Sequence, residues 1–351
     1  MLFDIAAVPF SRYGSYLAFA HLPAQANRPA GIYLRTLHGA APQREILRCE
    51  LSDAAGPVAT AAIAVRTTPS CLEMRTATGR IEICFSDTCS VRMRGEGLGL
   101  RLVFAPQLYD LALPRGPHWQ LNLFSSRMNL ALTALAGSIH VDAPCTEDGA
   151  EHLLVQCLPD ASGHFEIDLC EFQSTWPPAE KLPVVDFRGC ERAAAAEFNQ
   201  WLQQTPAVPA QYAQARELAA YVQWSCAVEA CGQLQRPALL MSKNWLHAVW
   251  SWDHCFNAMA LLAGNPALAW DQFMLPFDRQ DRHGALPDCF DDERTVWNFC
   301  KPPIHGWALM WMLRRTTFIG RKQLQEIYAP LSRWTAWWSE QRDDSGDGLP
   351  Q

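Results

Sequence analysis

The pattern of apolar and polar residues along the chain changes its period once. Before about residue 176, short runs alternate apolar and polar side chains between turn residues, which is the period of half-buried β-strands. The clearest runs are residues 32–37, 81–85, 100–104, 119–124 and 165–169. Because no helical stretch separates these runs, they predict an antiparallel β-sandwich and not a doubly wound parallel sheet.

After about residue 190 the apolar residues recur with the 3.6-residue period of helices. The predicted helices are residues 191–203, 210–231, 254–263, 266–277, 303–317 and 322–341, the last with an interruption expected at Pro330. Pro266 and Pro303 stand where a first-turn proline is tolerated, which supports two of the starts. In the last helix Trp334 and Trp337 fall on one apolar stripe.

The two periods divide the chain into domains. We predict a β-sandwich over residues 1–178, a linker with a helix over 179–207, and a helical domain over 208–351. Twelve of the 14 tryptophans fall after residue 200, which supports this division. The helices have large apolar faces without an obvious partner layer, so we expect the sequence to be part of a longer protein. By itself the chain should expose apolar surface from its last helices, around Trp334, Trp337 and Trp338.

Composition narrows the class of protein. The 351 residues are 49% hydrophobic and 19% charged, with a formal net charge of -7 and no run of Lys or Arg. These values exclude a disordered chain and argue against a nucleic-acid or anionic-membrane partner. No apolar stretch reaches the roughly 18–20 residues that span a bilayer. Thirteen scattered cysteines without a Cys-x-x-Cys pair indicate reduced, mostly buried thiols, and therefore a cytoplasmic location.

Three segments of the helical part carry candidate binding chemistry. In the first, Trp252 and Asp253 precede Asn257, and an aromatic ring beside a carboxylate suits a sugar. The alternative is that Asp253 caps the next helix and the tryptophan is core. The second segment is the polar loop from Gly284 to Asp288, because loops on a helical scaffold often carry binding sites. The alternative is that this loop is only a solvated connection.

The third segment opens a predicted helix and contains Lys301, His305 and Trp307. Free N–H groups at a helix start hold hydroxyl or carboxylate oxygens, and Lys301 and His305 add donors. The alternative reading is ordinary helix initiation, with His305 a core histidine.

A fourth motif resembles half of a metal loop. Asp343, Ser345 and Asp347 occupy positions 1, 3 and 5 of a calcium loop, and Gly348 occupies position 6. The closing Glu would fall beyond Gln351, so a helix stop is the favoured interpretation and no cofactor is expected. No phosphate loop, Gly-x-Ser-x-Gly or His-Glu-x-x-His motif occurs.

Taken in order, three stretches resemble the catalytic-domain motifs of glycoside hydrolase family 63, in its bacterial glucosidase and mannosylglycerate-hydrolase-like branch, with kinship to trehalases. They are "VWSWDHCFNAMAL", "DQFMLPFDRQDRHGALPD" and "VWNFCKPPIHGWAL". The opening "PFSRYGSYLAF" is similar to the start of such bacterial members. The resemblance implies an N-terminal β-sandwich, a linker helix and an (α/α)6 six-hairpin barrel, of which residues 208–351 would be the first half.

The resemblance also implies an inverting glycosidase acting on α-glycosides of small oligosaccharides or glycosylated small molecules. Inversion uses one carboxylic acid and one carboxylate base. In such enzymes the acid follows a loop like the one at Gly346–Pro350, so both groups are expected beyond Gln351 and the present chain is expected to be inactive alone. The missing half of the barrel would then be its partner.

Two other hypotheses stay open at the level of sequence. One is a catalytically inactive carbohydrate-binding or regulatory protein derived from such an enzyme. The other is an unrelated helical interaction protein in which the tryptophans are only core.

Overall fold

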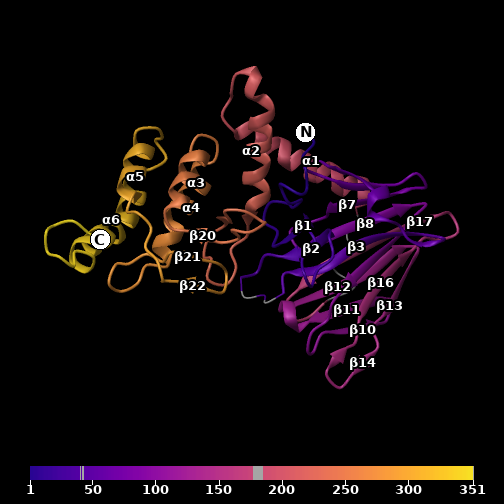
Figure 1. The fold of residues 1–351 in the computed structure, drawn as a ribbon. Coiled ribbons are helices and arrows are strands. Elements are labelled where there is room, and N and C mark those ends of the chain that lie inside the picture. The colour runs from indigo at the N-terminus through magenta and orange to yellow at the C-terminus, as the bar shows by residue number, and fades with distance from the viewer. Residues whose placement is uncertain (40, 42, 177–184, 351) are drawn as a thin grey trace. The chain divides into compact units, whose positions relative to one another are not determined.

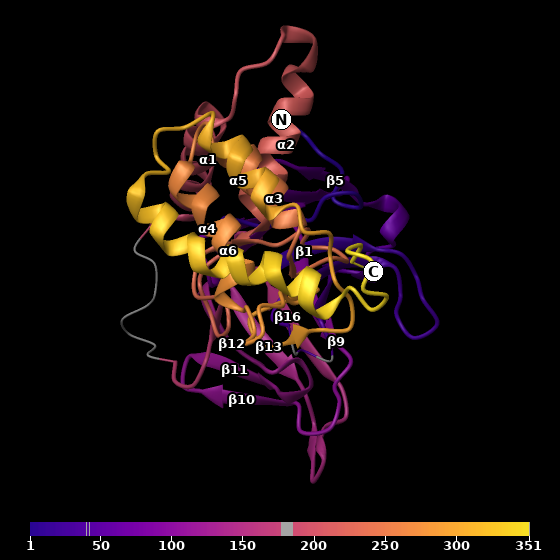
Figure 2. The same cartoon turned by 90° about the vertical axis from the view of Figure 1, so that its left-hand side faces the viewer.

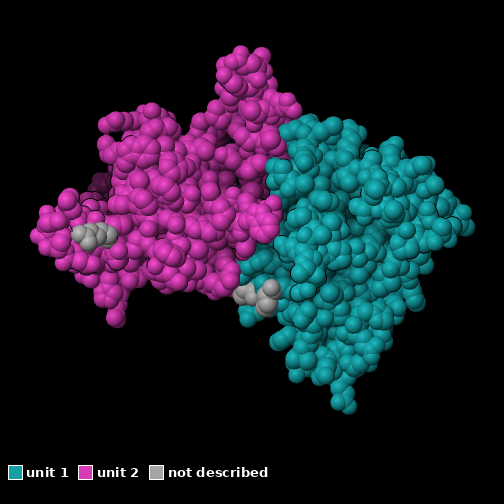
Figure 3. All heavy atoms as spheres, in the orientation of Figure 1, with its two compact units in different colours: residues 1–200 teal, residues 201–351 magenta. Residues whose placement is uncertain are grey.

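The chain folds into two compact units, which are described separately. The structure is a computed structural model that describes residues 1–39, 41, 43–176 and 185–350. The first unit comprises residues 1–200 and the second residues 201–351 (Figure 3). The predicted boundary between sandwich and linker, at residues 178 and 179, lies outside the described residues.

Antiparallel strands form two large sheets in the first unit (Figure 1). The seven-stranded sheet has the order β1-β2-β3-β9-β16-β13, with β4 also pairing β3. Its strands are β1 (Leu17–Leu22), β2 (Gly31–Thr36), β3 (Glu45–Asp53), β4 (Gly56–Pro57), β9 (Gly99–Phe104), β13 (Ser138–Asp142) and β16 (Leu153–Leu158).

The eight-stranded sheet has the order β10-β11-β12-β17-β8-β7-β6-β5. Its strands are β5 (Ala64–Thr67), β6 (Leu72–Arg75), β7 (Arg80–Phe85), β8 (Ser90–Glu96), β10 (Leu111–Arg115), β11 (His118–Leu123), β12 (Met128–Ala136) and β17 (His164–Phe172). A separate hairpin joins β14 (Cys145–Thr146) to β15 (Gly149–Ala150). Each of the five predicted runs coincides with a strand to within a few residues.

One apolar core lies between the two sheets. It takes alternate residues of strands in both sheets, such as Ile32 and Leu34 of β2 and Ile167 and Leu169 of β17. Burying one face of each sheet is the dominant stabilising term of a sandwich. The antiparallel β-rich fold of the N-terminal region is therefore confirmed.

A helix covers part of the outer face of the eight-stranded sheet. This helix, α1 (Phe187–Gln204), places Phe187 and Cys190 in a buried cluster with Cys71 and Cys84 of the sheet region. Arg188 of α1 also lies 3.0 Å from a carboxylate oxygen of Glu82 in β7. The first turns of α1 thus belong structurally to the first unit.

The second unit is mainly helical. Its elements are α2 (Ala213–Cys226), β18 (Ala227–Val228), β19 (Ala238–Leu239), β20 (Val249–Trp250), α3 (Asp253–Leu261), α4 (Pro266–Asp278), β21 (Cys289–Phe290), β22 (Thr295–Val296), α5 (His305–Leu313) and α6 (Arg321–Gln341). The α2 helix ends five residues earlier than predicted, because the chain turns into β18, which pairs with β19. The helical character of this part is confirmed.

Helix α6 is continuous through Pro330, contrary to the expected interruption. It crosses in front of the other helices of its unit in Figure 2. The side-chain amide of Gln280 donates a 2.9 Å hydrogen bond to the Pro330 carbonyl, so the loop that follows α4 contacts α6 at this proline. Trp334 is 1% exposed, and its ring stacks on that of Trp337 at a centroid distance of 5.3 Å, so the expected exposure is wrong for Trp334. Trp337 and Trp338 are partly exposed, and Leu324 and Tyr328 of the same helix are exposed.

Arg236 connects α4 with α6. Its Nε lies 2.7 Å from Oδ2 of Asp278 on α4, and its Nη2 lies 2.7 Å from Oε1 of Glu326 on α6. The other oxygen of Glu326 accepts a 2.9 Å hydrogen bond from Trp270 Nε1 on α4. These contacts fix the relative position of two helices that also pack directly on one another.

Among the described residues, no helix has both the length and the apolar character required to cross a lipid bilayer.

Candidate functional site

The candidate residues in the second unit lie at the starts of α3 and α5 and in the loop that leads into β21. Asp253 is the first residue of α3, and Trp252 is its N-cap residue, with no side-chain capping bond. Asp253 therefore does not cap the helix as the alternative reading supposed. A carboxylate in the first helical turn is stabilised by the free N–H groups there.

Asp288 and Lys301 form an ion pair beside this helix start. The Lys301 Nζ lies 2.8 Å from Asp288 Oδ1, and the two side chains are 27% and 10% exposed. The backbone of Asp288 is fixed as well, because its N–H donates to Val296 and its carbonyl accepts from Ser251. The pair is thus held by the small sheet β20-β21-β22 and is largely shielded from water.

The charges of Asp288 and Lys301 both affect the pKa of Asp253. Burial raises the pKa of Asp253 above its ordinary value, and the negative charge of Asp288 adds to the rise. Its own backbone N–H, the Lys301 charge and the Trp252 side chain act in the opposite direction. Two carboxyl groups and one ammonium group are therefore gathered from three separate segments.

An aromatic row borders these charges. The ring of Phe256 lies 6.0 Å from that of Trp252 and 6.5 Å from that of Trp307, measured between centroids. Phe256 is 46% exposed and Trp307 55% exposed. Phe256 was not among the predicted site residues, although it stands four residues after Trp252, the spacing that places both on one helix face.

Asn257 and Gly306 complete the description of these helix starts. Asn257 follows Asp253 by four residues and is half-buried, and its amide lies 3.5 Å from the Leu239 carbonyl. A Cβ added at Gly306 would have no neighbour within 4 Å, so there is open space beside the start of α5.

Two predicted site residues have structural positions instead. His305 is fully buried; its Nδ1 accepts a hydrogen bond from Trp334 Nε1 at 3.2 Å, and its Nε2 donates to the Ser251 carbonyl at 3.0 Å. Burial lowers the pKa of His305 to about 4. It is the neutral core histidine of the alternative reading, and it has no surface for a sugar.

Gly284 is the second correction. It is buried with φ +101°, and a Cβ there would lie 2.5 Å from the carbonyl oxygen of Arg333 in α6. Only glycine allows this approach in this backbone conformation. Gly284 therefore packs the loop against α6, and Asp288 is the residue of this loop that joins the charged groups.

The calcium-like loop has the geometry of a helix stop. The two carboxylate oxygens of Asp343 accept the N–H groups of Asp347 and Gly348 at 3.1 and 2.9 Å. Asp347 in turn accepts the N–H of Leu349. These hydrogen bonds hold the segment after α6 in a turn, and the calcium interpretation stays a prediction.

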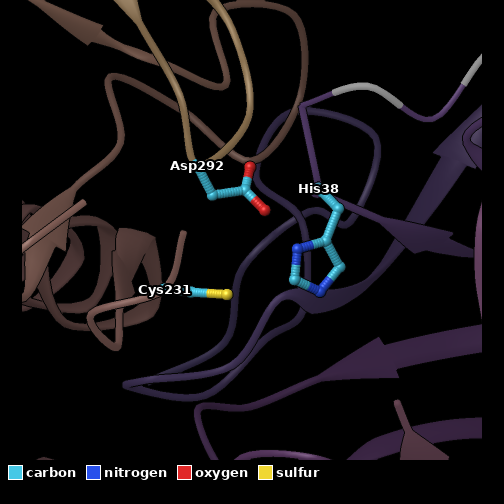
Figure 4. Close-up of side chains that lie close together, drawn as sticks. All are labelled: His38, Cys231 and Asp292. Carbon is cyan, nitrogen blue, oxygen red and sulfur yellow. The ribbon is translucent and has the colours of Figure 1, made fainter. Parts of the chain in front are cut away.

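Figure 4 draws three metal-ligating residue types from two different units. Cys231 and Asp292 belong to loops of the second unit, where the Asp292 carbonyl accepts the N–H of Gln233 at 2.7 Å. His38 belongs to the first unit, where its Nε2 lies 3.0 Å from Glu171.

Comparison with known proteins places this arrangement in context. Residues 246–351 match the family model described as a mannosylglycerate hydrolase MGH1-like glycoside hydrolase domain. The second unit resembles a glycoside hydrolase domain. No curated protein sequence matches the chain.

Solved structures of glycoside hydrolases share the fold of nearly the whole chain. A family GH92 glycosyl hydrolase aligns with a TM-score of 0.53 at 12% identity, covering 96% of this chain and 57% of its own. A bacterial glucoamylase complexed with acarbose aligns with a TM-score of 0.53 at 14% identity, covering 94% and 57%. The family GH92 inverting mannosidase of Bacteroides thetaiotaomicron gives 0.53 at 9% identity, covering 91% and 51%. The chain thus spans little more than half the length of these structures.

Proposed function

We propose that this chain is the N-terminal portion of an inverting glycoside hydrolase of the family 63 type, and that it carries part of the sugar-binding site. The match of residues 246–351 to an MGH1-like glycoside hydrolase domain supports the activity class. The three glycoside hydrolase structures support the combination of a β-rich region with helices.

The observation that carries the proposal is the gathering of Asp253, Asp288 and Lys301 beside exposed aromatic rings. A carboxylate accepts hydrogen bonds from sugar hydroxyls, and an ammonium group donates to them. An exposed ring such as that of Trp307 packs on the apolar C–H face of a pyranose. In this arrangement Asp253 and Lys301 hold hydroxyl groups while Trp307 and Phe256 position the ring.

We further propose that hydrolysis uses an acid and a base carried by chain beyond Gln351, as the resemblance implies. A groove of about 670 Å³ between α5 and α6 would receive part of that chain; its apolar lining includes Leu309, Leu324, Ile327, Tyr328 and Leu331. Tyr328 is 76% exposed on this face. Packing further helices there would bury the apolar surface that α6 now presents.

The binding half of the proposal is tested on the 351-residue chain. Saturation-transfer NMR and tryptophan fluorescence would follow titration with methyl α-D-mannopyranoside and methyl α-D-glucopyranoside. We expect Asp253→Asn to weaken binding by roughly 10- to 100-fold, because charge-assisted hydrogen bonds contribute about 1.5–3 kcal/mol each. Trp307→Ala should weaken it as well, whereas the exposed Tyr328→Ala on α6 serves as a matched aromatic control and should leave it unchanged.

The result that contradicts the proposal is sugar binding that neither Asp253→Asn nor Trp307→Ala alters, or no sugar binding at all. The catalytic half is tested with the full-length protein and α-glucosides, trehalose and mannosylglycerate as substrates. A full-length protein that binds these sugars without hydrolysing any of them would instead be the inactive carbohydrate-binding protein. The 351-residue chain alone should hydrolyse none.

A further inference from the structure

The first unit contains two cysteine sulfurs in contact with each other. Cys170 lies on β17, and Cys89 lies in the bend immediately before β8. Their sulfur atoms are 3.9 Å apart. We propose that these two residues are a thiol–disulfide exchange site, which a small-molecule disulfide converts to a Cys89–Cys170 cross-link.

The backbone around the pair is held in place on both sides. In the β17–β8 ladder Cys170 stands opposite Ser90. The Cys89 carbonyl accepts the N–H of Glu171 at 2.8 Å, and the Cys89 N–H donates to the Asp87 carboxylate at 2.8 Å. To form a disulfide, the two sulfurs must approach from 3.9 Å to a bonding distance of about 2.05 Å while these backbone contacts hold the neighbouring segments together.

The two sulfurs differ in access. Cys170 is 1% exposed and packs in a cluster with Ala131, Phe172 and Trp176, whereas Cys89 is partly exposed at the edge of that cluster. A small disulfide can therefore reach the sulfur of Cys89 but not that of Cys170. Cys170 can react only with a Cys89 that has already been modified.

The two sulfurs lie within hydrogen-bond distance of each other, and either can be the donor. With Cys89 as the donor, this bond lowers the pKa of Cys170 and raises that of Cys89. A thiolate and not a thiol is the attacking species in disulfide exchange. Cys170 is thus prepared to act as the resolving nucleophile once Cys89 has been modified.

The exchange balances in two steps. Cys89 transfers its proton to the Cys170 thiolate and, now a thiolate itself, attacks one sulfur of the small disulfide. A mixed disulfide forms, and the small thiolate that leaves takes the proton from Cys170. The Cys170 thiolate then attacks the Cys89 sulfur and expels the second small thiol. The protein loses two electrons and two protons, and one small disulfide is reduced to two thiols.

The experiment treats the folded 351-residue chain with oxidised glutathione, blocks remaining thiols with iodoacetamide, and maps the product by mass spectrometry. Combined cleavage after Lys or Arg and before Asp places Cys89 in residues 87–92 and Cys170 in residues 168–181, each without another cysteine. We expect these two peptides to appear cross-linked and to separate after dithiothreitol. The cross-linked chain should also unfold at a higher temperature, because the bond closes a long loop.

The cross-link should be absent from Cys89→Ser and Cys170→Ser, and should persist in Cys145→Ser, which removes an exposed cysteine elsewhere in the unit. The wild-type peptide map does not depend on the folding of any variant. The proposal is overturned if both peptides remain alkylated in the folded protein, or if Cys89 stops at the mixed disulfide with glutathione.

Discussion

The Asp288–Lys301 ion pair can be tested quantitatively by replacing Lys301 with Met. At a separation of 2.8 Å and an effective dielectric constant of 20, the two charges attract by about 6 kcal/mol before the cost of removing them from water. Removing one partner of a fully buried pair costs about 3–5 kcal/mol. Because Lys301 keeps 27% of its side-chain surface exposed, we expect Lys301→Met to lower the free energy of unfolding by about 2 kcal/mol.

The assay is urea denaturation at pH 7 of four proteins: the wild type, Lys301→Met, Asp288→Asn and the double variant. This double-mutant cycle isolates the interaction between the two side chains. We expect a coupling energy of about 1–2 kcal/mol, so the double variant should be more stable than the sum of the single losses implies.

A second ion pair in the same unit provides the matched control. Arg294 Nη2 lies 3.0 Å from Asp291 Oδ2, but the Arg294 side chain is 55% exposed. Asp291 also accepts the backbone N–H groups of Glu293 and Arg294. Arg294→Met should therefore cost only about 0–1 kcal/mol. If Lys301→Met lowers the free energy of unfolding no more than Arg294→Met does, or if the coupling energy is near zero, then burial does not strengthen the Asp288–Lys301 pair.

Two further predictions concern the core of the second unit. Burial lowers the pKa of both His254 and His305 to about 4, so between about pH 6.5 and 4 the unfolded chain binds protons that the folded chain excludes. The free energy of unfolding should therefore fall as the pH decreases through this range. In denaturation curves measured across it, His305→Gln should reduce the dependence of that free energy on pH. Gly284→Ala should destabilise the unit by more than about 2 kcal/mol, because the added Cβ would contact the Arg333 carbonyl. Gly306→Ala is the control: its Cβ meets open space, so it should be neutral or slightly stabilising in the same thermal denaturation experiment. Equal effects of the two variants would show that the backbone near Gly284 can move to accommodate a Cβ.

Much of the fold could be predicted from the sequence because strands and helices have different local periods. The run 100–104 and the helix starting at Pro266 were located to within a residue of β9 and α4. The end of α2 was missed because β18 depends on pairing with β19, a partner eleven residues away that periodicity does not reveal. The continuity of α6 through Pro330 was also missed, because an internal proline removes one helical hydrogen bond and by itself favours a break.

The candidate site was predictable only in part. Asp253, Asp288 and Lys301 could be named from residue type and position in loops and helix starts. The sequence could not distinguish a surface histidine from a core one at His305, because its partners Trp334 and Ser251 are 29 and 54 residues away. Gly284 likewise stood in a plausible loop, and only the nearness of α6 explains why it is a glycine.

The backbone of Ser251 connects the main chain at Asp253 with the main chain at Asp288. Its N–H donates to the Asp288 carbonyl, its own carbonyl accepts from His305, and Asp253 follows two residues later. Any displacement of Ser251 therefore carries both acidic residues with it. The main-chain separation of Asp253 and Asp288 is therefore set by one hydrogen bond and by the two peptide units that lead from Ser251 to Asp253.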